Sequence, residues 1–82
     1  MPTIFTFGSY RVVVYPNDHR PAHVHVIGPD GEAVFNLRCP GGPLELRESF
    51  GLSVQEVNRI ARQIEIELAE LCKAWKEHHD DY

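Results

Sequence analysis

Three of the five histidines in this sequence lie within seven consecutive residues, at His19, His23 and His25. His23 and His25 are two residues apart in a segment where polar and apolar residues alternate. In an extended strand, side chains at this spacing point to the same face of the sheet, ~6.6 Å apart along the strand. We therefore expect these two imidazoles to share one face, with rings able to converge.

This arrangement suits two kinds of chemistry. Neutral imidazole is a ligand for zinc and other divalent transition metals, so His23 and His25 with His19 from the preceding loop predict an open metal site of the catalytic type. Without a metal, the pair could act as general base and acid, with Arg11 or Arg20 binding an anionic phosphate or carboxylate. A third interpretation gives the histidines only hydrogen bonds within the sheet or at an interface. The sequence leaves all three open.

The elements that position these residues are expected to be strands. Segments rich in β-branched and aromatic residues alternate with turn formers, and Gly8-Ser9 and Pro29-Asp30-Gly31 are typical of hairpin turns. Two hairpins are therefore predicted, with the histidine pair on the third strand. The predicted strands are residues 3–7, 10–15, 22–27, 32–37 and, at an edge, 44–47.

A helix is predicted to follow the strands. Ser53-Val54-Gln55-Glu56 is a capping box, and Leu52 and Val57 match the hydrophobic staple that accompanies it. Apolar residues then recur at helical spacing through Trp75, in a stripe that starts at Val54, while Ile66 falls on the polar side. One continuous helix would be ~37 Å long, so we expect part of it to extend beyond the sheet.

The predicted fold is α+β: a four- to five-stranded antiparallel sheet, made of two hairpins, packed on one long C-terminal helix. Residues 1–82 are expected to form a single domain, with the sheet and histidine loop in 1–48 and the helix in 53–79. A single helix covers one face of a sheet. The other face is expected to be open, shielded by loops or covered by a partner, and we expect a homodimer or a complex with a small partner protein to stabilise so small a core.

Composition limits the cellular setting and the partners. No apolar run reaches the ~20 residues of a membrane-spanning helix, and the N-terminus does not resemble a secretion signal, so we expect a cytoplasmic protein that does not bind membranes. Cys39 and Cys72 lack metal-ligand or redox spacing and are expected to be reduced thiols. His78 and His79 are expected to be solvated at the helix end. The net charge of -4 makes non-specific DNA binding unlikely.

A set of short motifs is spread over nearly the whole chain: Met1-Pro2-Thr3, Gly8-x-Tyr10-Arg11, Pro21-Ala22-His23-Val24-His25-Val26, Asp30-Gly31-Glu32-Ala33-x-Phe35 and Ala74-Trp75. With these motifs the chain resembles the domain of unknown function 4160 family of small bacterial and archaeal proteins. This sequence has Pro21-Ala22 where the family typically has two prolines, and its Cys39–Pro43 loop looks longer than usual. The resemblance implies a prokaryotic protein encoded beside another small domain, and such pairs are proposed toxin–antitoxin systems.

Two functions compete at this point. The first is a toxin-like protein whose histidines form a metal or acid–base site acting on a phosphate-containing substrate such as RNA, with Arg11, Arg20 and Arg38 supplying local positive charge. The alternative is a non-enzymatic module that binds a second copy or a neighbouring small protein. The cofactor is unknown, with zinc or another divalent transition metal as the candidate.

Overall fold

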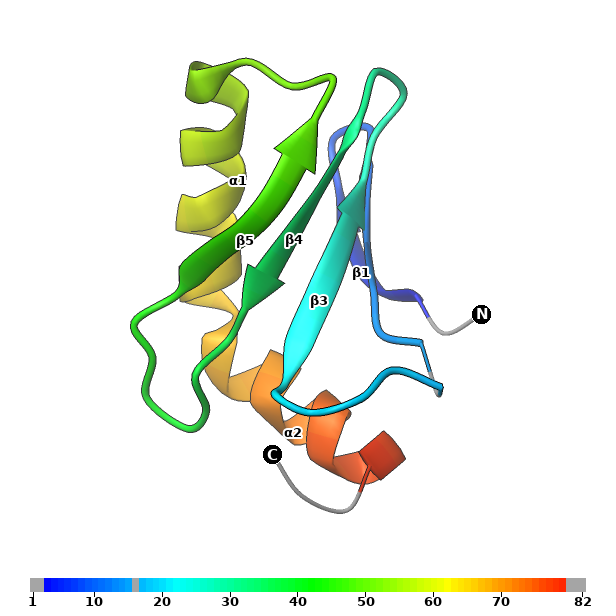
Figure 1. Ribbon diagram of the computed structural model, residues 1–82, viewed down its shortest axis with the longest axis vertical. Helices are drawn as coiled ribbons and strands as arrows, with labels where there is room; N and C mark the ends of the chain where they lie inside the picture. Colours follow the sequence, from blue (N-terminus) through cyan, green and yellow to red (C-terminus); the bar gives the residue numbers. More distant parts are fainter. Residues whose placement is uncertain (1–2, 16, 80–82) are drawn as a thin grey trace.

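The computed structural model describes residues 3–15 and 17–79, so Met1 and Pro2 of the predicted sheet segment lie outside the described residues. A five-stranded antiparallel sheet in the order β1-β2-β3-β4-β5 has two helices on one face (Figure 1). The predicted α+β class and both hairpins are therefore confirmed. The elements are β1 (Thr3–Phe7), β2 (Tyr10–Val13), β3 (His23–Ile27), β4 (Glu32–Asn36), β5 (Glu45–Phe50), α1 (Val54–Ile66) and α2 (Leu68–His79).

The core lies between the sheet and the helices. Alternation along each strand sends one set of apolar side chains to the helix face, where Val24 and Val26 of β3 neighbour Phe35 and Ala33 of β4 across the ladder. The helices contribute the predicted apolar stripe. The buried residues of this cluster are Val12, Val14, Ala22, Val24, Val26, Ala33, Phe35, Leu37, Ile60, Ile64, Leu71, Cys72 and Trp75.

The capping box at the start of α1 is confirmed. The Glu56 N–H donates to Ser53 Oγ at 3.1 Å, and the Ser53 N–H donates to Glu56 Oε1 at 3.2 Å. The Tyr10 hydroxyl donates to Glu56 Oε2 at 2.9 Å and so joins β2 to the helix start. The Ser53 backbone and then the Tyr10 hydroxyl lower the pKa of Glu56, while the hydrogen bond with Glu56 raises the pKa of Tyr10.

The prediction of a single long helix is wrong in one respect, because the helical segment divides at Glu67 into α1 and α2. The Glu67 N–H donates to both Gln63 O (3.3 Å) and Ile64 O (3.1 Å), a shared hydrogen bond typical of a tightening last turn. The longest dimension of the molecule is 33 Å, shorter than the predicted helix. The break changes the direction of the chain so that the apolar sides of both halves stay on the sheet (Figure 1).

Two further differences concern the ends of elements. Val54 was expected in the buried stripe but is 74% exposed, because it occupies the first helical position. The fifth strand does lie at the edge of the sheet, but it runs to Phe50 rather than ending at Arg47. Ile66, predicted on the polar side, is exposed.

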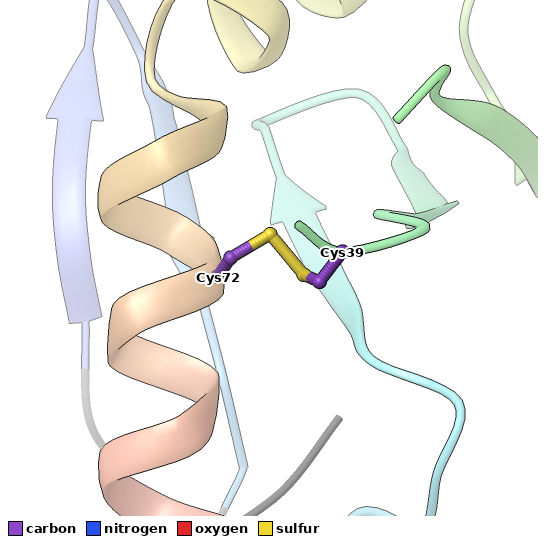
Figure 2. The surroundings of a disulfide bond; sticks show 2 residues. All are labelled: Cys39 and Cys72. Carbon is purple, nitrogen blue, oxygen red and sulfur yellow. A yellow bond between two sulfur atoms is a disulfide. The ribbon is translucent and has the colours of Figure 1, made fainter. Parts of the chain in front are cut away.

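The expectation of two reduced thiols is wrong. Cys39, in the loop after β4, forms a disulfide with Cys72 of α2 (Figure 2). The two residues are 33 positions apart, and only the folding of the loop against the helix brings them together. Because disulfides are typical of oxidising compartments, the cysteines give no support to the expected cytoplasmic location.

The sheet face opposite the helices is shielded in part by the loop between β2 and β3. Tyr15 of this loop contacts the His25 ring edge-on, with ring centroids 4.8 Å apart. Val13 and Val34 are buried although they alternate with the residues that face the helices. In the part of the chain that the structure describes, neither helix has the length and apolar character needed to cross a membrane.

Candidate metal and acid–base site

The predicted convergence of His23 and His25 is confirmed on the sheet face opposite the helices. Their ring centroids are 5.3 Å apart, and Nε2 of each ring points to the same carboxylate oxygen, Asp18 Oδ2. The distances to this oxygen are 3.3 Å from His23 Nε2 and 3.4 Å from His25 Nε2. Within residues 3–15 and 17–79, this trio forms a group whose ligand atoms all lie within 4.8 Å of one another.

Each imidazole is oriented by a hydrogen bond at its other nitrogen. His23 Nδ1 lies 2.9 Å from the Pro21 carbonyl oxygen, and His25 Nδ1 lies 3.1 Å from Glu32 Oε2. A carbonyl and a carboxylate can only accept, so both Nδ1 atoms must donate. This is the arrangement that supports metal-ligating histidines in proteins, in which a carbonyl or carboxylate fixes the tautomer and leaves Nε2 as the ligand atom.

A positive charge at the centre of the cluster would balance its donors and acceptors. An imidazole that donates from Nδ1 directs its Nε2 at Asp18 Oδ2, and this Nε2 is the atom that could bind a cation or carry a second proton. His25 Nε2 is buried and makes no hydrogen bond within the described residues. A proton shared as an ion pair and a metal cation held between the three atoms are the two ways to supply the charge.

Local structure explains why Asp18 reaches the strand. The Asp18 N–H donates to Tyr15 O at 3.0 Å, closing a turn directly after β2. The Tyr15 N–H donates back to Asp18 Oδ2 at 3.3 Å, which holds the carboxylate over the sheet. The turn formers of this loop thus do more than connect two strands, since they also place the acidic member of the cluster.

An open pocket of about 380 Å³ contains the cluster. His19 and Arg20, both predicted site residues, line it, but His19 lies outside the ligand group, whose third member is Asp18 and not the predicted His19. Arg11, on β2, is exposed and does not line the pocket. Arg38 does not line the pocket either and is paired with Glu45 at 2.8 Å. The residues that line the pocket are Asn17, Asp18, His19, Arg20, His23, His25, Arg47 and Glu48.

Sequence reasoning missed Asp18, Arg47 and Glu48. Asp18 carried a usable signal, since it is a carboxylate next to His19 in the loop that delivers the chain to the histidine strand. Arg47 and Glu48 carried none, because they reach the pocket only through the pairing of β5 with β4, in which Glu48 lies opposite Val34.

A second ionic group lies beside the site. Glu45 of β5 accepts hydrogen bonds from Asn36 Nδ2 (3.0 Å) and from Arg38 Nη2 (2.8 Å). These two hydrogen bonds, Asn36 first, lower the pKa of Glu45. The group ties β5 to β4 at the end of the sheet where the histidine strand begins, since Asn36 also lies opposite His23 in the ladder.

One of three comparisons with known proteins gives a match, and that match is to a family. Neither the search of curated proteins nor the search of solved structures found a match to this chain. A family model does match, and it covers residues 9–76, which include all three residues of the cluster and both cysteines. The resemblance seen in the sequence is thereby confirmed: the chain belongs to the family described as Domain of unknown function (DUF4160).

Proposed function

We propose that this protein is a small metalloenzyme in which Asp18, His23 and His25 hold one divalent transition-metal ion, such as zinc, and that it hydrolyses a phosphate-containing substrate such as RNA. One observation carries the proposal. Both Nδ1 atoms are engaged by acceptors, while both Nε2 atoms point to one carboxylate oxygen, Asp18 Oδ2. This is the arrangement of histidines that bind a metal through Nε2 and are oriented by a carbonyl or carboxylate at Nδ1.

The two distances between the imidazole nitrogens and the carboxylate oxygen support a metal of this size. Two ligands of a tetrahedral zinc ion, each ~2.0–2.1 Å from the metal, are ~3.3–3.4 Å apart. The two Nε2 atoms lie 3.3 and 3.4 Å from Asp18 Oδ2. A set of two imidazoles and one carboxylate is a donor set that zinc accepts in catalytic sites, where the fourth position is left for water or substrate.

The surroundings of the cluster support hydrolysis of an anion. A bound divalent metal would lower the pKa of a coordinated water and polarise a phosphoryl oxygen. Arg20 and Arg47 line the same pocket, and guanidinium groups are the side-chain groups best suited to phosphate oxygens. Glu48, also in the lining, is a carboxylate outside the ligand group, and we assign it the role of exchanging a proton with the attacking water.

The net charge of -4 does not oppose a site-specific ribonuclease. Affinity for a nucleic acid depends on the local potential where the backbone sits, and two arginines flank the cluster. A toxin-like ribonuclease is the specific form of the proposal that agrees with the idea of toxin–antitoxin pairs. The acidic remainder of the surface would confine binding to the pocket.

The test is hydrolysis by purified protein loaded with zinc or manganese, using an RNA oligonucleotide and the small diester bis(4-nitrophenyl) phosphate. His23→Ala/His25→Ala should abolish metal-dependent cleavage, whereas the control His78→Ala, at an exposed position of α2, should leave it unchanged. Arg47→Gln should raise KM more than it lowers kcat, because it binds the anion. Equal cleavage by the double variant would contradict the proposal.

A chelator separates the metal mechanism from acid–base catalysis by the histidines alone. Cleavage by a metal-dependent enzyme stops on treatment with EDTA and returns when the metal is added back. Cleavage that persists after the metal has been removed, but is lost in His23→Ala/His25→Ala, would assign the reaction to the imidazoles as general base and acid.

A second candidate function is protein binding, which exposed apolar side chains favour. Four large apolar residues are exposed to solvent in the described part of the chain: Leu46, Phe50, Val54 and Ile66. Leu46 and Phe50 both lie on β5, the edge strand whose free side can pair with another chain. Sizing chromatography with light scattering tests for a homodimer, which Leu46→Ser/Phe50→Ser should dissociate; a monomer at all concentrations would contradict the homodimer.

A further inference from the structure

We infer that Trp75 is a positioning residue for the metal site: its indole holds the His23 imidazole in the one orientation that presents Nε2 to Asp18. The inference rests on the proposed metal site, because it explains how one of the ligands is preorganised. Trp75 does not touch the cluster centre. Trp75 lies on α2 and acts through its ring contact with His23.

The His23 ring is enclosed by other rings on two sides. The Trp75 indole lies with its centroid 5.2 Å from the His23 ring, at an interplanar angle of 49°, and the His25 ring lies 5.3 Å away at 65°. His23 is only 4% exposed and Trp75 is fully buried. A rotation of the His23 ring about its Cβ–Cγ bond, which would exchange the positions of its two ring edges, would have to pass through this filled space.

The hydrogen bond to the Pro21 carbonyl does not fix the ring alone. A hydrogen bond within a protein replaces one to water and therefore gives only a modest net preference, so a ring with free space beside it would populate other orientations. In those orientations Nε2 would leave Asp18. The Trp75 indole occupies the space that these other orientations of the His23 ring would need. We therefore assign Trp75 a role in the site in addition to its role in the core.

The position of Trp75 is supported by His79 and by the disulfide on α2. The His79 ring stacks on the indole, with centroids 3.8 Å apart and planes at 11°, and His79 Nδ1 lies 3.1 Å from the Trp75 carbonyl oxygen. His79 is therefore partly buried, contrary to the expected solvated position, whereas His78 is exposed as expected. One turn before Trp75, the disulfide at Cys72 anchors α2 to the loop after β4 (Figure 2).

The test must separate positioning from core packing, because any truncation of Trp75 also removes buried surface. Trp75→Leu is compared with Leu71→Ala, a truncation of a second fully buried residue on the same helix that is not among the residues in ring contact with His23. Trp75→Phe keeps an aromatic ring beside His23 and serves as the conservative rescue. All variants are studied below their unfolding temperatures, as verified by circular dichroism.

Two readouts are used, one of them independent of metal. Long-range 1H–15N correlation spectra of the metal-free protein at neutral pH report the tautomer of His23, and titration with Co2+ reports its affinity through the visible absorption of the ion. We expect wild type, Leu71→Ala and Trp75→Phe to show His23 with a protonated Nδ1. Trp75→Leu should show a mixture of tautomers and bind Co2+ about tenfold to a hundredfold more weakly, the range for lost support of a ligand.

The outcomes are distinguishable. If Trp75→Leu keeps the wild-type tautomer, or if Leu71→Ala loses it to the same extent, the indole does not position His23 and the inference is overturned. If wild type binds no Co2+ while Trp75→Leu still scrambles the tautomer, the proposed metal site fails and the positioning role of Trp75 stands.

Discussion

Loss of the Cys39–Cys72 disulfide is expected to destabilise this protein strongly. The bond closes a loop between positions 33 residues apart in a chain of 82 residues. In the chain-entropy description, a closed loop of this size removes ~12 cal/mol/K from the unfolded state, which corresponds to ~4 kcal/mol at 25 °C. Because native domains are stable by only ~5–15 kcal/mol, this is a large share of the total for so small a core.

The assay compares oxidised wild type with the same protein kept reduced, so that no side chain changes and only the cross-link is removed. For a domain of this size, each kcal/mol of lost stability lowers the midpoint temperature of unfolding by ~4–8 °C. The midpoint measured by circular dichroism should therefore fall by ~15–30 °C on reduction. The slope of the free energy of unfolding against urea should rise on reduction, because the unfolded chain becomes more expanded. Cys39→Ala/Cys72→Ala should match the reduced protein, apart from the small packing loss at buried Cys72.

Equal unfolding midpoints for the oxidised and reduced proteins would refute this reasoning. Mass spectrometry under denaturing conditions supplies the control, because the disulfide form lacks two hydrogens and does not react with iodoacetamide. If the oxidised protein carries the bond and still gains no stability, the constraint on the unfolded chain is not what holds α2 to the loop after β4.

Three further results are expected. Glu32→Gln should weaken metal binding about tenfold to a hundredfold in a calorimetric titration, because His25 loses its carboxylate acceptor at Nδ1; unchanged affinity would contradict the role given to Glu32. Because the pKa of Glu56 is lower in the folded than in the unfolded protein, its carboxylate stabilises the fold above the unfolded pKa, and this stability is lost as pH falls through the folded pKa. In a plot of the unfolding midpoint against pH, Glu56→Gln should therefore show a smaller drop at acidic pH than wild type. An equal drop in both proteins would contradict this. Phe35→Ala should cost about 3–5 kcal/mol in urea unfolding, because Phe35 is buried in the core beneath the helices; a loss below 1 kcal/mol would mean that this core repacks easily.

Most of the sheet could be predicted from the sequence because its signals are local. Gly8 adopts the positive φ of 55° that its hairpin turn requires, and Ser53 and Glu56 cap the helix as their spacing indicates. Alternation along β3 placed the two histidines on one face and Val24 and Val26 on the other. In each of these features, neighbouring residues determine the geometry, so a short stretch of sequence is enough to predict it.

The features that were missed depend on contacts between distant segments. No glycine or proline marks the break at Glu67, which follows from the fit of two helical segments to a short sheet. The disulfide depends on the loop after β4 folding onto α2, which the identity of Cys39 and Cys72 does not reveal. Asp18 joins the cluster only because a turn returns its carboxylate over β3.

The coordination of zinc in the purified protein, measured by X-ray absorption at the zinc K edge, tests the central claim most directly. We predict one zinc per chain, bound by nitrogen and oxygen at ~2.0–2.1 Å, with the multiple scattering of two imidazoles. Both imidazole signals should be lost in His23→Ala/His25→Ala and kept in His78→Ala. Absence of stoichiometric zinc, or a sulfur shell at ~2.3 Å, would contradict a site built from Asp18, His23 and His25.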